Sequence, residues 1–151
     1  MIKTSILFIF SIFLCYLLSS CCDTEFPEDP YQEIIGNWET NLNRNYYTAG
    51  DKPLSSNAPL MYRPKDLPKT YYEFSKGKTY NEFNQKGELI SYGTYTIENR
   101  RLTLHTGNKH FISYAIISFS QNNLWLRYSF DCGNYEGEKL MQIHEITLSK
   151  Y

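Results

Sequence analysis

Three histidines are the residues of this chain whose type points first to chemistry, because neutral imidazole is a common ligand of zinc and other transition metals. His105 and His110 stand on either side of the segment "TGNK", where a hairpin would bring them together, and His144 lies near the end of the chain. No cluster of cysteine or aspartate accompanies them, and the expected strand alternation points His105 outward. We therefore expect solvated histidines, no metal site and no cofactor.

Nucleophilic or acid–base catalysis needs groups that the sequence places together, and the familiar motifs are missing. The chain has no GxSxG nucleophile elbow, no GxxxxGK[ST] phosphate loop and no HExxH. Glu73, Glu82 and Glu145 fall on predicted strands and would converge inside a barrel, but glutamates on strands usually face water. We expect that the protein is not an enzyme.

Tyrosine is unusually frequent, with 14 residues in the chain. Its side chain offers a flat apolar body with a hydroxyl at the tip, so a tyrosine-lined cavity would suit sugars, aromatic metabolites or amphipathic lipids. β-sheets also favour tyrosine for packing reasons alone. Both interpretations stay open at the level of sequence.

A thiol at the end of an apolar segment is the next chemical feature. The chain is almost free of polar residues from Ile6 to Leu18, after the single charge of Lys3, and two cysteines follow at 21 and 22. A helix over 6–18 would span about 20 Å, which is less than the roughly 30 Å hydrocarbon core of a bilayer. The segment therefore predicts a secretory leader rather than a transmembrane helix.

The segment Leu18-Ser19-Ser20-Cys21 resembles the lipobox of bacterial lipoproteins, in which leucine and two small residues precede a cysteine that receives a diacylglycerol. The resemblance implies that residues 1–20 are a lipoprotein signal peptide and that Cys21 becomes the lipidated first residue. Acyl chains at this position would anchor the protein in the membrane. The expected location is the outer membrane of a Gram-negative cell envelope, facing either the periplasm or the cell surface.

The stretch that follows is acidic and contains prolines, so we expect 21–33 to be the lipidated N-terminus and a tether. The whole chain is nearly neutral, with 15 basic and 16 acidic residues, which argues against nucleic acid as a partner. A disulfide between Cys22 and Cys132 is open, because envelope proteins form disulfides but neither residue lies in an expected rigid segment. The oligomeric state is not predicted.

Beyond residue 33 the chain alternates between short apolar-polar runs and turn signals such as "NQKGE", "ENR" and "SQNN", a pattern typical of antiparallel β-sheets. One long segment, 43–68, breaks this rhythm with four prolines, and its apolar residues favour a functional lid over a linker. The predicted strands are 34–41, 69–76, 78–84, 89–98, 101–106, 110–119, 124–130 and 138–149. The expected lid residues are Tyr46, Tyr47, Leu60, Met61 and Tyr62.

Gly36-Asn37-Trp38 on the first predicted strand resembles the Gly-x-Trp opening of the lipocalins. Together with "GKTYNEF", "GTYTIENRRLTLHT" and "YAIISFSQNNLWLRY", it resembles the bacterial lipocalin-like lipoproteins, small acylated barrels of Gram-negative gut anaerobes. The resemblance implies an all-β, antiparallel, eight-stranded up-and-down barrel of the calycin type over 34–151. It also implies that Gly36 and Trp38 close one end, with Arg127 packed on the tryptophan.

A barrel of eight strands is just wide enough to be filled by side chains or to hold one small ligand. Strand alternation assigns ten residues to its interior, where they would contact such a ligand. They are Tyr72, Phe74, Tyr80, Tyr95, Ile97, Leu102, Leu104, Ile116, Leu124 and Leu126.

The sequence thus predicts a lipid-anchored envelope protein whose barrel binds a small apolar or amphipathic ligand without transforming it. The alternative is a filled barrel that acts as an interaction or assembly module and binds a protein or glycan through its outer surface. The lid, Tyr92 and Trp125 would contribute to that surface.

Overall fold

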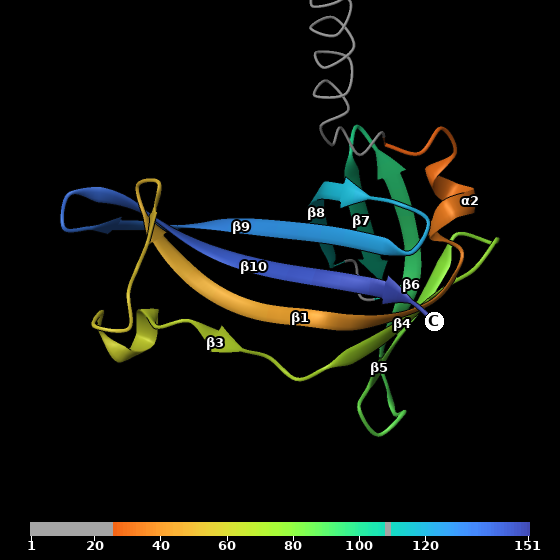
Figure 1. The fold of residues 1–151 in the computed structure, drawn as a ribbon, viewed down its shortest axis with the longest axis horizontal. Coiled ribbons are helices and arrows are strands. Elements are labelled where there is room, and N and C mark those ends of the chain that lie inside the picture. Colours follow the sequence, from red (N-terminus) through yellow and green to blue (C-terminus); the bar gives the residue numbers. More distant parts are fainter. Residues whose placement is uncertain (1–25, 108–109) are drawn as a thin grey trace, which may run out of the picture.

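A computed structural model describes residues 26–107 and 110–151 of the chain, shown as a ribbon in Figure 1. The expected signal peptide, the lipidation site at Cys21 and the neighbouring Cys22 lie outside the described residues. Within the described ranges, no helix has both the length and the apolar character needed to span a membrane.

The described chain is almost entirely β-structure, preceded by one short helix. The helix α2 covers Pro30–Ile34, and a single 3₁₀ turn, η1, covers Leu60–Tyr62. The strands are β1 (Gly36–Ala49), β2 (Lys52–Pro53), β3 (Lys65–Asp66), β4 (Thr70–Phe74), β5 (Thr79–Asn84), β6 (Leu89–Glu98), β7 (Arg101–Thr106), β8 (Phe111–Phe119), β9 (Asn123–Tyr135) and β10 (Glu138–Lys150).

Eight of these strands form a closed antiparallel barrel, which confirms the expected fold class. Each of the strands from β4 to β10 pairs with its neighbour in the chain, β1 pairs with β4, and β10 returns to pair with β1. This last pairing runs from Trp38 opposite Lys150 to Ala49 opposite Leu140. The hydrophobic core and all these pairings join residues of the described ranges to one another, so 26–151 forms a closed barrel with a core of its own.

Strand positions agree with the predicted ones over most of the barrel, but β1 and β9 are longer than expected. β1 continues through the predicted loop start to Ala49, and β9 continues through "DCGNY" to Tyr135. Both extensions are paired to β10, which lies between them. The turn between β9 and β10 is reduced to Glu136 and Gly137, with φ values of 52° and 85° that suit a tight hairpin.

These extensions create a feature that the sequence did not predict, an arm that projects from the barrel (Figure 1). We define the arm as residues 45–66 and 129–143. The strands β4 and β8 end before they reach it, so only β1, β9 and β10 continue, with β2 and β3 added along the outer edge of β1. The arm therefore has two exposed faces where the barrel has an inside and an outside.

The end of the barrel beneath Trp38 is closed by α2. Asp29 caps this helix by accepting hydrogen bonds from the backbone N–H groups of Tyr31 and Gln32, both at 3.1 Å. Ile34 at the end of the helix is fully buried, and its carbonyl accepts a 2.7 Å hydrogen bond from Nε1 of Trp38, which is itself fully buried. Helix and tryptophan thus form one plug.

The cation packed on Trp38 is Lys150, whose Nζ lies 5.3 Å from the ring centroid. Arg127, which the lipocalin resemblance placed there, lies 5.7 Å from the ring of Trp125 on the outer face of β9, so that expectation is wrong. Gly36 has a φ of +132°, and a Cβ at this position would lie 2.7 Å from Cε of Lys150. The backbone conformation therefore favours glycine here, whereas the flexible end of the Lys150 side chain could shift away from a larger residue.

Residues expected in the tether belong to the folded domain. The ring of Phe26 contacts Phe119 edge-to-face at 6.0 Å, and Tyr31 stacks on Tyr95 at 6.1 Å. The hydroxyl of Tyr31 also accepts a 2.9 Å hydrogen bond from the backbone N–H of Ile97. The folded domain therefore includes Phe26 and Tyr31, which precede residue 34, because these aromatic groups pack against the closed end.

Replacement of Trp38 by alanine should lower the free energy of unfolding by about 3–5 kcal/mol, because it empties a fully buried site and removes the hydrogen bond to Ile34. Tyr92→Ala is the control, since Tyr92 is 62% exposed on β6 and its loss should change stability by less than about 0.5 kcal/mol. Urea unfolding measures both. Equal losses in the two variants would show that the plug does not stabilise the barrel.

Candidate functional site

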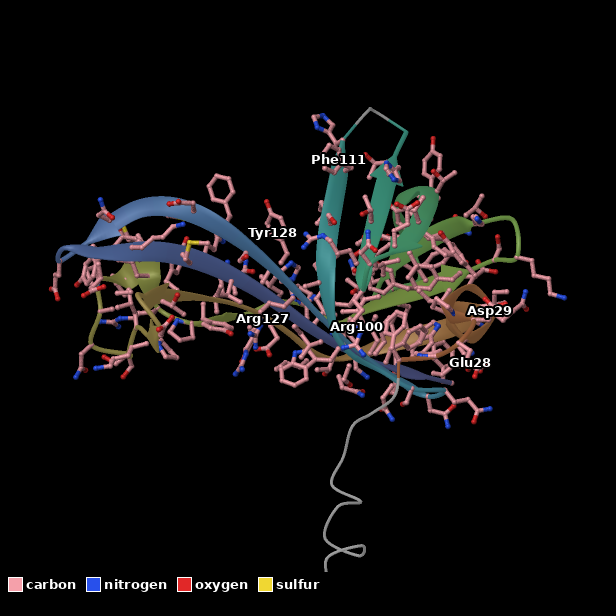
Figure 2. All side chains as sticks on the ribbon, turned by 90° about the horizontal axis from the view of Figure 1, so that it is seen from above. Glu28, Asp29, Arg100, Phe111, Arg127 and Tyr128 are labelled. Carbon is pink, nitrogen blue, oxygen red and sulfur yellow. The ribbon has the colours of Figure 1, made fainter. Side chains whose placement is uncertain are left out.

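The barrel is hollow at the end opposite α2. A cavity of about 420 Å³ opens between the β5–β6 hairpin and the β7–β8 hairpin, whose flanking residues Asn84, Ile90, Thr106 and Ile112 form part of its wall. Figure 2 shows Phe111 at this open end, with Glu28, Asp29 and Arg100 at the opposite end. We call this open end the mouth.

The ten residues assigned to the interior are all buried, but they divide into two groups. Tyr72, Tyr80 and Leu104 line the cavity. The other seven do not line it and pack instead in the closed half of the barrel, where the ring of Phe74 meets Tyr95 edge-to-face at 5.1 Å. These seven are Phe74, Tyr95, Ile97, Leu102, Ile116, Leu124 and Leu126.

A carboxyl group lies in the cavity wall. Glu82 on β5 faces inward, and its Oε1 accepts a 2.8 Å hydrogen bond from the hydroxyl of Tyr72. Burial raises the pKa of Glu82, and the hydrogen bond from Tyr72 opposes this in part. Glu82 makes no ion pair within the part of the chain that the structure describes. Its charged form is therefore solvated poorly and left without a counter-charge.

An imidazole occupies the other side of the cavity. Nδ1 of His144 lies 3.4 Å from the hydroxyl of Tyr114, and its Nε2 lies 2.9 Å from Oδ1 of Asn43. The two contacts fit a neutral ring that accepts from the tyrosine and donates to the amide oxygen. Burial lowers the pKa of His144, so the neutral form is favoured. This histidine is half-buried, which contradicts the expectation that all three histidines are solvated.

The cavity continues outward into a groove between the barrel and the arm. This second hollow has a volume of about 340 Å³ and shares Ile112, Tyr114 and His144 with the cavity, so the two adjoin. Tyr128 and Phe130 extend its wall along β9. Figure 2 shows Tyr128 on the opposite face of β9 from Arg127, as strand alternation requires. A ligand longer than the cavity would leave the barrel along this groove.

The expected lid residues lie elsewhere. Tyr46 and Tyr47 belong to β1, and none of the five residues lines the cavity. The ring of Tyr62 contacts Tyr47 at 5.2 Å and Tyr135 at 5.4 Å, forming an aromatic cluster on the arm, while Leu60 and Met61 are exposed. These five residues therefore do not cover the mouth, and the 43–68 segment contributes to the cavity wall only through its ends, at Asn43, Leu67 and Pro68. Pairing with β10 holds its first part in the sheet.

A second carboxylate is buried on the outer wall. Glu145 is only 3% exposed and accepts hydrogen bonds from Nη2 of Arg44 at 2.7 Å and from Nε1 of Trp125 at 2.8 Å, with Arg127 at 3.6 Å. Burial alone would raise its pKa, but the arginines and the indole N–H outweigh this and lower it. Here the charge is fully paired, in contrast to Glu82, which indicates a structural role at the base of the arm.

Among the cavity residues that were absent from the expected interior set, three carried a signal in their strand positions. Glu82 shares strand parity with Tyr80, and Tyr114 shares it with Ile116. His144 likewise alternates with the buried Ile146. Asn43 had no such signal, because it fell in the segment predicted as a loop.

Comparison with known proteins adds no assignment: no protein-family model matches the chain, and no curated protein matches its sequence.

Within the described residues, no group of three or more His, Cys, Asp or Glu side chains is arranged to hold a metal ion. Cys132 is exposed on β9, and Cys22, whose pairing with Cys132 the sequence left open, lies outside the described residues.

The lowered pKa of His144 makes a prediction about acid stability. The unfolded chain takes up a proton near the ordinary value of 6.5, whereas the folded cavity resists it, so protonation favours unfolding as the pH falls. The stability of wild type relative to His144→Gln should decrease between about pH 7.5 and about pH 5.5. Urea unfolding at several pH values measures this difference.

His105→Gln is the matched control, since His105 is exposed on the outer face of β7. Its stability relative to wild type should stay constant over the same pH range. A constant difference for His144→Gln as well would show that the cavity accepts the imidazolium.

Proposed function

We propose that this protein is a lipid-anchored envelope protein whose barrel binds a small apolar or amphipathic ligand at its mouth. The observation that carries the proposal is the division of the barrel into a filled half and a hollow half. The closed half packs tightly around Trp38 and Phe74, whereas the mouth leaves about 420 Å³ between walls of tyrosine, leucine and isoleucine. Cavities of this size with mostly apolar walls and a few polar groups are typical of small-molecule sites.

Burial of apolar ligand surface would supply most of the affinity, at roughly 25 cal/mol per Å² removed from water. The hydroxyls of Tyr80 and Tyr114 and the carboxyl of Glu82 would orient the ligand. The exposed apolar side chains Ile90, Phe111 and Ile112 at the rim give an entering ligand a first contact. The eight-stranded barrel and the lipobox-like segment before Cys21 support membership of the lipocalin-like lipoproteins.

A second function is favoured by the arm. Leu60 and Met61 on η1 are 79% and 71% exposed, and among the described residues β9 has no neighbouring strand beyond Tyr128 on the side away from β10. Exposed apolar residues beside an open strand edge are typical of surfaces that bind another protein. The protein would then act as an assembly module through the arm, with the cavity empty.

Binding of the neutral fluorophore N-phenyl-1-naphthylamine to residues 23–151 tests the first function. A saturable one-to-one increase in emission is expected. Ser91→Trp should weaken binding at least about tenfold, or about 1.4 kcal/mol, because Ser91 lines the cavity and the indole would fill it. Circular dichroism verifies that the variant is folded.

Thr94→Trp is the matched control, because Thr94 lies on the same strand and its side chain is exposed on the outer face. It should bind the fluorophore as wild type does. Lack of saturable binding by the wild-type domain would reject the first function and favour the second.

Lipidation is tested by feeding an alkyne-tagged fatty acid to cells that express the full chain. The tag should label wild type and Cys22→Ser, whereas Cys21→Ser should lose both the label and its membrane association, since the acyl chains supply the anchor. Labelling of Cys21→Ser at the wild-type level would place the lipid elsewhere or exclude the lipoprotein assignment.

A further inference from the structure

We propose that the mouth cavity selects ligands that carry an organic ammonium group on an apolar body, with the ammonium at Glu82 and the apolar body in the groove along the arm. The inference rests on the proposed ligand-binding function and specifies its chemical class. Three observations carry it: the charge of the cavity, the aromatic groups around that charge, and the direction in which the cavity continues.

The cavity contains one acidic group, Glu82, that has no ion-pair partner among the described residues. Lys69, the basic residue in the wall, is already paired, because its Nζ lies 2.9 Å from Oε2 of Glu39. Burial lowers the pKa of His144 and favours its neutral form, which fits its contacts with Tyr114 and Asn43. The uncompensated charge that the wall can present is therefore the carboxylate of Glu82. A bound cation would supply the missing counter-charge, whereas a bound carboxylate would meet repulsion.

The hydrogen-bonding atoms of the wall point to the same ligand. Glu82 uses Oε1 to accept from Tyr72, and Oε2 has no hydrogen bond within the described residues. In the groove, Oδ1 of Asn45 is buried, and no described residue donates a hydrogen bond to it. Both atoms are acceptors, so a ligand that donates hydrogen bonds or carries positive charge satisfies them.

Three tyrosine side chains line the cavity together with this carboxyl group. Tyr72 donates to Glu82 directly, and the nearby charge of Glu82 contributes to the raised pKa values of Tyr80 and Tyr114. Aromatic faces attract organic cations, and a carboxylate among several rings is a typical arrangement for recognising ammonium groups. The three tyrosines and Glu82 come from β4, β5 and β8, so the closed barrel itself brings them together.

The apolar part of the ligand has a defined exit. The groove adjoins the cavity at Ile112, Tyr114 and His144, and continues past Tyr128 to Phe130, which is 55% exposed. A chain attached to an ammonium at Glu82 would therefore leave the barrel over these side chains. Short ammonium ions would use the cavity alone.

The test displaces N-phenyl-1-naphthylamine from residues 23–151 with two amphiphiles of equal chain length, dodecyltrimethylammonium and dodecanoate, below their micelle concentrations. The ammonium compound should displace the fluorophore at a concentration at least about tenfold lower than dodecanoate. Glu82→Gln should abolish this preference, so that the two amphiphiles displace the fluorophore at similar concentrations, and circular dichroism verifies that the variant is folded. Glu73→Gln, an exposed carboxylate on β4, should keep the preference.

The groove is tested with Phe130→Ser, a change at an exposed position. It should weaken dodecyltrimethylammonium several-fold and leave tetramethylammonium unchanged, because only the longer ligand reaches the groove. Equal displacement by the two amphiphiles, or tighter binding of dodecanoate, would overturn the ammonium assignment. Saturable fluorophore binding in the same experiment would still support ligand binding in the cavity. Absence of saturable fluorophore binding would overturn both.

Discussion

The pairing of the first long strand with the last determines the rest of this molecule. β1 and β10 stay paired from Trp38 and Lys150 to Ala49 and Leu140, a length that exceeds the height of the barrel. Within the barrel this pairing removes both free edges of the sheet, and beyond it the same pairing continues as the arm. One long-range contact thus produces the closed container and its extension. Because it joins residues about a hundred positions apart, its formation carries the largest loop-closure entropy in the fold.

A barrel of eight strands has too little interior space to be both well packed and hollow at the same level. In this protein the packed half and the hollow half follow one another along the barrel axis. Aromatic residues and α2 fill the closed half, where Trp38 and Phe74 are almost fully buried. The other half gives up that packing and holds polar groups such as Glu82 and His144 among tyrosines. Buried polar groups cost stability unless they are satisfied. The filled half therefore supplies the stability that a less favourable, chemically selective half requires, which is common where a site is built into a fold.

Sequence patterns predicted the barrel well because each strand signals its own faces. Alternation placed residues such as Tyr80 inside, and turn residues marked most hairpins. The same parity rule also places Glu82 inside, yet the general preference of glutamate for water was given more weight, so the central residue of the cavity was assigned to the wet face. The arm was not predictable in this way. Tyr46 is in a strand because Ile143 lies opposite it, and the sequence around Tyr46 does not indicate a pairing partner so distant in the chain. Local pattern thus predicts faces, whereas strand length depends on tertiary pairing.

The attachment of Phe26 to the closed end sets a direction for the whole domain. Phe26 follows Cys21 by five positions, and a fully extended chain of that length spans at most about 18 Å. With a lipid on Cys21, the plugged end would be held close to the host bilayer, and the mouth, which lies at the opposite end, would face the water beyond. A molecule in the same bilayer would have no direct route into the barrel. Molecules that enter the mouth would then come from the aqueous compartment or from a facing surface, and a protein anchored in this way would receive a ligand across a gap rather than from the membrane that holds the lipid.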